Sequence, residues 1–385
     1  MVVQHPRHSL LNNSPTPLTL KNFDYMKKLI IISLAALVAL CACTKNEIAE
    51  GAKKEVTFSV ATFSGQTKAD PADYADNYAD IPFGTYAWFY GEEDGAQAQS
   101  FMEDETVSYT GSEWKPSLTY YWPKSGSIDF ISYSPKSISE YVTVTEESIN
   151  IGEADKEYIV EHMSAIDVMY ADKAVAQTKN IDTYYYNGVP TLFRHALAKI
   201  NVNVKTAYDK KVMKEGEDET KWAITVTDLA IENYYKKGTV ELGLNSSDNI
   251  WNLPTDAVWT PAGDLVEKQS FTLPTDATIS QTTKPFVQDY FVLPQTLDQD
   301  QTIEVTVTIV TTLPNGKTIT ETGVKLSALM STDDLKAWQM NKQISYDLTI
   351  IPASSDDDGD PVAILFDPAV KDWEDATEEP INFTK

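Results

Sequence analysis

The chain has 385 residues, of which 42% are hydrophobic and 23% are charged, a balance typical of a globular protein with room for two domains. Its formal net charge of −26 excludes a surface built for nucleic acid or anionic lipid, since both need clustered Lys and Arg. The two cysteines, Cys41 and Cys43, and the four histidines are too few for a disulfide framework or for chemistry that depends on Cys and His.

The N-terminal segment has the pattern of an export signal. Met26-Lys-Lys is followed by an apolar run, Leu29–Leu40, which is far shorter than the ~20 residues that span a membrane. We therefore predict a signal peptide with its true start at Met26, preceded by an unpatterned extension over residues 1–25.

The residues that end this signal resemble the bacterial lipobox. Leu40 lies three positions before Cys43, and the small residue Ala42 lies directly before it. We expect cleavage between Ala42 and Cys43, so that residues 1–42 are removed and Cys43 carries the lipid. Several acyl chains together anchor a protein stably, at roughly 0.8 kcal/mol per buried methylene.

Beyond the signal, apolar residues alternate with polar ones, which is typical of antiparallel strands with one buried face. The clearest runs are Val56–Val60, Ala196–Val204, Ile303–Ile309 and Ile344–Ile350. The alternation slips by one residue within Ile224–Ile231, which predicts a β-bulge. Asn315-Gly316 predicts a hairpin turn between two strands.

Strands that recur every 8–15 residues or so predict an all-β protein made of two β-sandwiches. A turn cluster at Tyr186–Pro190 divides them into residues 43–190 and 191–352, and an acidic linker with a final strand and tail follows at 353–385. Ser331–Trp338 resembles a helix start with a capping box, so we predict one short helix there.

Several segments, taken in order, resemble the fimbrillin family, the pilus subunits and accessory subunits of Bacteroidales type V fimbriae. They cover nearly the whole chain after the signal: Tyr120-Tyr-Trp-Pro-Lys-Ser-Gly126, Ile128-Asp-Phe-Ile-Ser-Tyr-Ser-Pro135, Asp167-Val-Met-Tyr-Ala171, Phe193-Arg-His-Ala-Leu-Ala-Lys-Ile200, Tyr290-Phe-Val-Leu-Pro-Gln295, Trp338-Gln-Met-Asn-Lys-Gln-Ile-Ser-Tyr346 and Phe366-Asp-Pro-Ala-Val-Lys-Asp-Trp373.

This resemblance implies two tandem transthyretin-like Greek-key β-sandwich domains and export as a lipoprotein to the outer membrane and the cell surface. It also implies assembly with other fimbrial subunits by donor-strand insertion, and adhesion to a host or bacterial receptor. Members of the family typically lose the first strand of the N-terminal domain to an Arg-specific protease. Here that strand carries Val56, Phe58 and Val60, and Lys68-Ala69 stands where an Arg site is expected. An uncleaved, anchored or accessory subunit fits this departure better than a stalk subunit.

Other features favour ordinary structural roles. Asp356, Asp358 and Asp360 have the spacing of calcium ligands, but Pro361 stands where the calcium loop needs glycine, so we interpret them as a solvated linker. His195 falls inside a predicted strand and is interpreted as structural. We assign no catalytic residue, metal or cofactor.

The alternative function is a carbohydrate-binding surface lipoprotein of a nutrient-uptake system. In that case exposed, coplanar tryptophans would stack on sugars, and the candidates are Trp88, Trp114, Trp122, Trp251 and Trp259. A glycosidase with a pair of carboxylic acids is a third hypothesis, for which no pair can be named from sequence.

The lipid anchor gives the first testable prediction. Cys43→Ala should move the protein from the membrane fraction to the soluble fraction, or leave an unprocessed precursor, because the acylated residue is lost. Cell fractionation and the mass of the N-terminal peptide measure this, and Cys41→Ala is the matched control. Unchanged fractionation of Cys43→Ala, with no lipid mass on that peptide, would refute the anchor.

Overall fold

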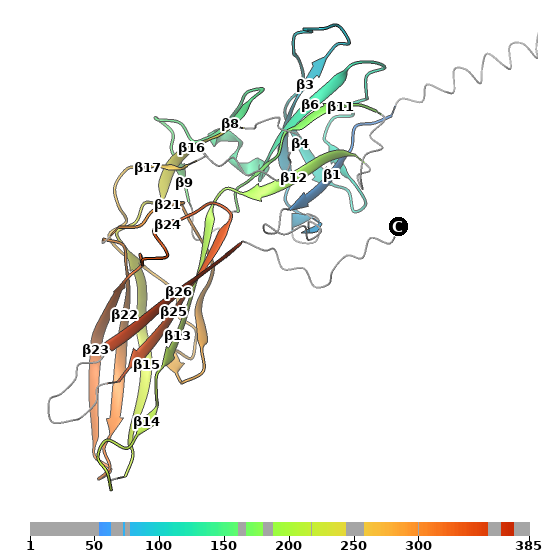
Figure 1. Cartoon of the computed structure of the whole chain (residues 1–385). Helices are drawn as coiled ribbons and strands as arrows, with labels where there is room; N and C mark the ends of the chain where they lie inside the picture. Colours follow the sequence, from blue (N-terminus) through green and yellow to red (C-terminus); the bar gives the residue numbers. More distant parts are fainter. Residues whose placement is uncertain are drawn as a thin grey trace, which may run out of the picture. The chain divides into compact units, whose positions relative to one another are not determined.

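The computed structural model describes residues 54–62, 72–73, 78–160, 167–179, 188–216, 218–243, 258–298, 300–352 and 363–372. Every strand named below lies within the compact unit of residues 55–385. Within the described ranges the protein is built of strands, with one short 3-10 helix at Lys136–Tyr141 (Figure 1). The described residues contain no helix that is long and apolar enough to cross a membrane. The all-β prediction is confirmed.

The first sheet closes on itself. Pairing runs from β1 through β12, β10, β6, β3, β4 and β5 and returns to β1, because β10 pairs with both β12 and β6. We call this closed sheet the N-terminal ring; β2 and β11 pair at its margin. Its strands are β1 (Phe58–Thr62), β2 (Ala72–Asp73), β3 (Phe83–Tyr90), β4 (Gln99–Tyr109), β5 (Trp114–Pro116), β6 (Ser127–Ser134), β10 (Met169–Ala171), β11 (Ala174–Gln177) and β12 (Val189–His195).

The ring encloses a hydrophobic core rather than a channel. Alternation along β6 sends Ile128 and Phe130 into this core, together with Phe83, Trp114 and Phe193, which are buried. Ile131 and Tyr133 point to the opposite face of β6, where they join a second core. β6 is therefore apolar on both faces, which explains its nearly unbroken hydrophobic sequence.

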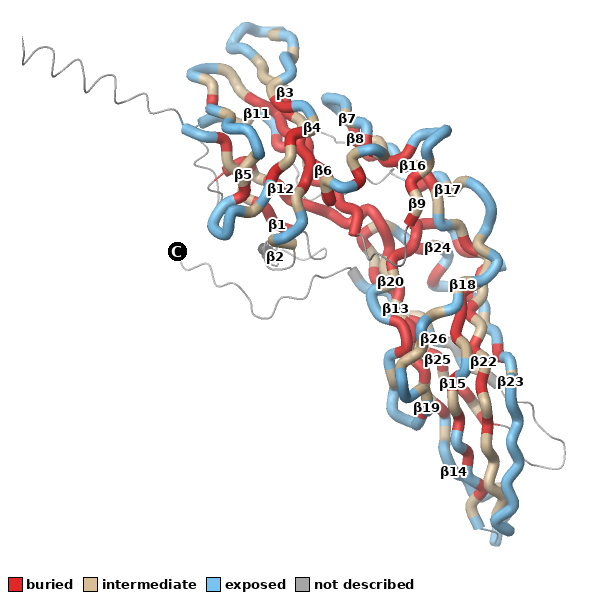
Figure 2. The backbone as a smooth tube through the Cα atoms, turned by 180° about the vertical axis from the view of Figure 1, so that it is seen from behind, coloured by how far each residue is buried: buried red, intermediate tan, exposed pale blue. Residues whose placement is uncertain are grey.

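Two further sheets pack face to face across the largest core. The first has the order β20–β13–β25–β26, with β13 and β25 parallel; the second is β14–β15–β22–β23. Their bounds are β13 (Ala198–Thr206), β14 (Lys210–Lys211), β15 (Thr220–Glu232), β18 (Gln269–Ser270), β19 (Thr278–Ile279), β20 (Lys284–Val292), β22 (Thr302–Thr312), β23 (Thr318–Leu329), β25 (Lys342–Ile351) and β26 (Ala363–Asp372). Figure 2 shows buried residues along β13 and exposed ones along the edge strand β23.

A small sheet, the joint sheet, fastens the N-terminal ring to this C-terminal sandwich. It consists of β7 (Val142–Val144), β8 (Ser148–Ile151), β9 (Tyr158–Ile159), β16 (Lys237–Gly243) and β17 (Thr260–Ala262). β8 comes from the N-terminal half of the chain and β16 from the C-terminal half, and they pair over four residues. Beneath them, Ile149, Leu242, Trp259 and Leu293 share one buried core. The two halves are therefore joined by backbone hydrogen bonds and by packing. A last pair, β21 (Gln295–Thr296) with β24 (Ala337–Trp338), completes the strands.

The local turn and bulge predictions are confirmed. β15 and β22 shift register between Val226 and Asp228, where the apolar alternation slips. The hairpin of β22 and β23 turns at Asn315-Gly316, and Gly316 has a φ of 78°, a left-handed conformation that glycine adopts without strain.

The strand predicted from the alternation over Ala196–Val204 starts two residues later, at Ala198. The chain leaves the ring after β12 and enters the sandwich at β13, with Ala196 and Leu197 between them. Ala196 N–H donates to the Val168 carbonyl at 2.7 Å, and the Leu197 carbonyl accepts from Asn341 N–H at 3.0 Å. Because those two residues bond to different partners, the change of sheet lies six residues beyond Pro190.

The helix predicted at Ser331–Trp338 is wrong. Thr332 and Leu335 form a tight turn instead, in which Leu335 N–H donates to Thr332 Oγ1 at 3.1 Å. The chain then enters β24, where Trp338 is buried and its Nε1–H donates to the Tyr346 hydroxyl at 2.7 Å. Burial of one large aromatic side chain outweighs the local preference for a capped helix.

The joint core gives a prediction about stability. Trp259 is 2% exposed, and its indole N–H donates to the Ala196 carbonyl at 2.7 Å, at the point where the chain changes sheet. Trp259→Phe should lower the free energy of unfolding by about 1–3 kcal/mol, because the buried carbonyl loses its donor. The half-buried Trp88 is the control, and Trp88→Phe should cost less than about 1 kcal/mol. Equal effects in urea unfolding would contradict this role for Trp259.

Candidate functional site: the first strand and its groove

The first strand contributes one full face to the core of the N-terminal ring. Val56, Phe58 and Val60 are 1%, 4% and 7% exposed, as their alternation predicts. The Phe58 ring meets Phe83 and Phe130 edge to face, with centroids 5.6 and 5.7 Å apart. We call the channel that these three side chains fill the first-strand groove.

The backbone of β1 is bound unequally along its two edges. On one edge it pairs in parallel with β12 over five residues, from Phe58–Val189 to Thr62–Phe193. On the other edge its ladder contacts are one pair with β5, Phe58–Trp114, and two with β2. Just ahead of β1, Val56 N–H donates to the Tyr120 carbonyl at 2.9 Å. The strand thus closes the ring while holding one neighbour far more tightly than the other.

The start of the groove has no room for a side chain on β12. A Cβ at Gly188 would lie 2.7 Å from the Thr57 carbonyl oxygen, a distance that real Cβ atoms do not reach. The next residue, Val189, donates its N–H to that same oxygen at 2.8 Å. Glycine at position 188 therefore permits the close parallel approach of β1 and β12.

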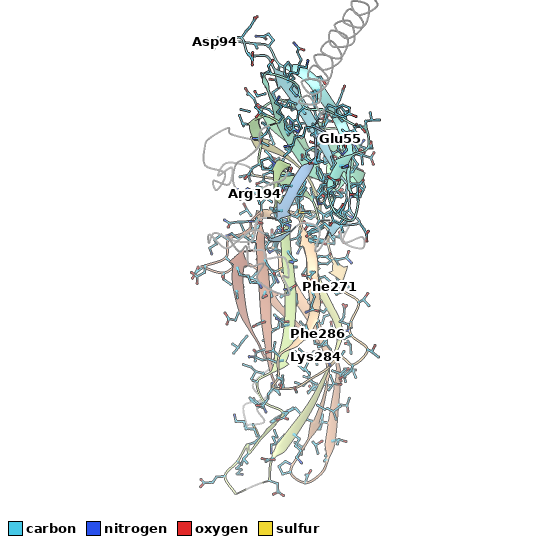
Figure 3. The ribbon with its side chains drawn as sticks, turned by 90° about the vertical axis from the view of Figure 1, so that its right-hand side faces the viewer. Glu55, Asp94, Arg194, Phe271, Lys284 and Phe286 are labelled. Carbon is cyan, nitrogen blue, oxygen red and sulfur yellow. The ribbon has the colours of Figure 1, made fainter. Side chains whose placement is uncertain are left out.

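Beyond Thr62 the ring becomes polar. Asp167 Oδ2 accepts a hydrogen bond from the Tyr78 hydroxyl at 2.8 Å and lies 2.8 Å from His195 Nδ1. His195 is fully buried, which agrees with a structural role. On the opposite face of β12, Arg194 makes a bidentate pair with Asp172, at 2.8 Å for both contacts (Figure 3 labels Arg194). Burial raises the pKa of the Asp172 carboxyl, and the Arg194 guanidinium opposes that rise.

Several predicted site residues lie outside the described residues. These are Ala42, Cys43, Lys68 and Ala69, as well as Asp356, Asp358, Asp360 and Trp251. In the part of the chain that the structure describes, no three His, Cys, Asp or Glu side chains are grouped to hold a metal ion. Trp114, Trp122 and Trp259 are buried in cores, while Trp88 is half-buried and its ring stacks beside Tyr86.

Sequence reasoning missed the polar end of the groove. Asp167 and His195 lie in separate sequence motifs, 28 residues apart, and only the pairing of β10 with β12 brings them together. Tyr78 lies in a repetitive Asp-Tyr-Ala segment that gives no sign of a buried partner. A buried His within a strand was the available signal, because such a side chain needs a polar partner.

Phe58 gives a prediction for the groove. Phe58→Ala should lower the free energy of unfolding by about 3–5 kcal/mol, because it removes a buried ring and leaves a cavity. Ser59→Ala, on the opposite face of the same strand, should change it by less than about 0.5 kcal/mol. Chemical denaturation of both variants measures the difference. A Phe58→Ala protein as stable as the native chain would show that the ring does not depend on this strand.

Residues 67–373 match the family model described as fimbrillin-like. No curated protein shows significant similarity to the sequence. Among solved structures, a fimbrial protein from Bacteroides vulgatus has a TM-score of 0.55 at 18% identity, covering 83% of this chain and 100% of the other. Candidate cell adhesion proteins from Parabacteroides distasonis (TM-score 0.46, 15% identity, 86% and 99% covered) and Bacteroides uniformis (0.42, 17%, 83% and 99%) are also similar. The match over most of its length shows that the chain belongs to the fimbrillin-like family.

Proposed function

We propose that this protein is a subunit of cell-surface fimbriae that is exported as a lipoprotein, anchored in the outer membrane through Cys43, and joined to neighbouring subunits by strand exchange. Its role is structural and adhesive, without catalysis. The observation that carries the proposal is β1, a strand that closes a hydrophobic ring but is paired fully along one edge alone. Family membership and the shared fold of the Bacteroides vulgatus protein support it. The division into two transthyretin-like sandwiches is part of the same proposal.

Removal of β1 would create a binding site from the residues already present. The ring would open between β12 and β5, exposing Phe83, Phe130 and the backbone edge of β12. An extended segment of another subunit can cover both the apolar core and the unpaired edge of β12. Its backbone would pair with β12, and its alternate apolar side chains would fill the groove. The same exposure would otherwise lead to aggregation.

The last strand, β26, is a suitable donor. It pairs with β25 over ten residues, and of its described side chains Ile364 packs against the sandwich core. Val370 lies opposite the buried Ile344 and so faces the core, yet it is 47% exposed, and Leu365 on the other face is 59% exposed. β26 is an edge strand whose described backbone pairing is with β25, so a single ladder holds it to its sheet.

Lys68-Ala69 is the candidate maturation cleavage site, since it lies in the segment between β1 and β2. A cut there would remove Cys43 together with β1, so the subunit that keeps its lipid anchor is the uncleaved one. An Arg-specific protease does not suit a lysine at this position. The lysine therefore favours an anchored or accessory role over a stalk role. The carbohydrate-binding alternative needs exposed, coplanar tryptophans, and three of the five candidates are buried.

The proposal is tested with the mature chain lacking residues 44–68. The truncated protein should elute as oligomers or aggregate in size exclusion with light scattering, whereas the full mature chain should elute as a monomer. Adding excess peptide with the sequence of residues 55–62 should restore the monomer, because it fills the groove. A truncated chain that stays monomeric and melts at the native temperature would refute strand exchange.

A further inference from the structure

The inner face of the first-strand groove changes chemistry at one end. Phe58, Val60 and Thr62 lie opposite Val189, Thr191 and Phe193, one after another, along β12. The next inward residue of β12 is His195, which pairs with Met169, a member of the same ring core. A strand that ran two residues beyond Thr62 in this register would therefore place its next inward side chain opposite His195.

Two buried polar atoms at this end lack hydrogen-bond partners. Asp167 Oδ2 is engaged by Tyr78 and His195, but Asp167 Oδ1 has no partner, although the residue is 8% exposed. Thr62, which is fully buried, also has an unpartnered hydroxyl. Unpaired polar atoms in a core destabilise it, and native proteins rarely leave them. Over Phe58–Thr62, β1 fills the apolar part of the groove, and Asp167 Oδ1 at the polar end has no hydrogen-bond partner.

The chemistry of the missing partner follows from these atoms. An ionised carboxylate oxygen only accepts hydrogen bonds, so Asp167 Oδ1 requires a donor. The other oxygen of the same carboxylate lies 2.8 Å from His195 Nδ1, and His195 is the residue that the extended register would reach. A neutral amide suits such a buried place better than a second charge, because burying a charge costs more than burying an amide.

We propose that Tyr78, Asp167 and His195 form a recognition point that selects the incoming strand. The preferred strand carries apolar side chains at the positions of Val56, Phe58 and Val60, and an Asn or Gln side chain two residues beyond the position of Thr62. This inference rests on the proposed function, because a foreign strand reaches the groove only if exchange occurs. It also fixes the register of that strand, because a displacement by two residues would carry the amide away from Asp167.

Displacement of β1 tests the inference in the full mature chain. The chain is cut once by a specific protease whose site is inserted after Lys68, so that a labelled β1 fragment stays bound without a covalent link. Two peptides with the sequence of residues 55–64 then compete for the groove, one carrying Ser64→Asn and the other the nearly isosteric Ser64→Leu. The Asn peptide should displace the fragment at a concentration about tenfold lower or better, since a hydrogen bond to a buried charged group is worth at least that factor.

Two variants of the protein test whether Asp167 causes the preference for the Asn peptide. Asp167→Asn replaces the charged acceptor with a neutral one, so the preference for the Asn peptide should fall below about threefold. Asp172→Asn is the matched control, because that carboxylate pairs with Arg194 on the opposite face of β12, and the preference should be unchanged.

The outcomes separate the two proposals. If both peptides displace β1 equally well from the native protein, strand exchange stands and the recognition point is wrong. If the preference survives Asp167→Asn but not Asp172→Asn, the selecting carboxylate has been misplaced. If neither peptide displaces the fragment at any concentration while the cut chain remains folded, the proposed exchange itself fails.

Discussion

The architecture of the N-terminal half depends on the parallel contact between β1 and β12. Five consecutive residues pair there, and the Phe58 side chain seals the core against Phe83 and Phe130. Each fully buried apolar side chain contributes roughly 1.5–3 kcal/mol, so Val56, Phe58 and Val60 together match the stability of a typical domain. The proposed strand exchange would use this dependence, because a ring without its first strand would expose the apolar face that another strand can cover.

Two edge strands of the C-terminal sandwich, β23 and β26, carry features that hinder pairing with another chain, and the first-strand groove lacks such features. β26 carries Pro368, which has no N–H to donate, and Lys371, a charge near its end. β23 contains Gly323 at a φ of 69°, where its pairing with β22 shifts register. Such irregularities discourage unwanted pairing at exposed edges. The joint sheet uses the remaining edges of β8 and β16 to hold the two halves together. Pairing with other chains is thus disfavoured along β23 and β26.

The sequence predicts the strands well and their arrangement poorly. Alternation places Val202, Val305 and Leu348 in the core, because one apolar face of a strand must be buried whatever its neighbours are. The bulge near Val226 and the turn at Gly316 are equally local and equally predictable. Closure of the ring is not local, since it depends on β10 meeting β6, whose residues are far apart in the sequence. The same is true of the polar end of the groove, because no pattern in the chain links Tyr78 to Asp167. The helix prediction at Ser331 failed because a partner outside the predicted segment, Tyr346, accepts a hydrogen bond from Trp338 and holds it in β24.

The direction of the β1–β12 pair has a mechanical consequence. Because the two strands are parallel, the chain enters β1 and leaves β12 toward β13 at opposite ends of the pair. Tension between the segment ahead of β1 and the C-terminal sandwich therefore pulls the strands past each other along their length. Every hydrogen bond between them then shares the load at the same time. A peeling geometry would instead break those bonds one by one, at a much lower force. A strand that replaced β1 in the same direction would inherit this resistance to shear.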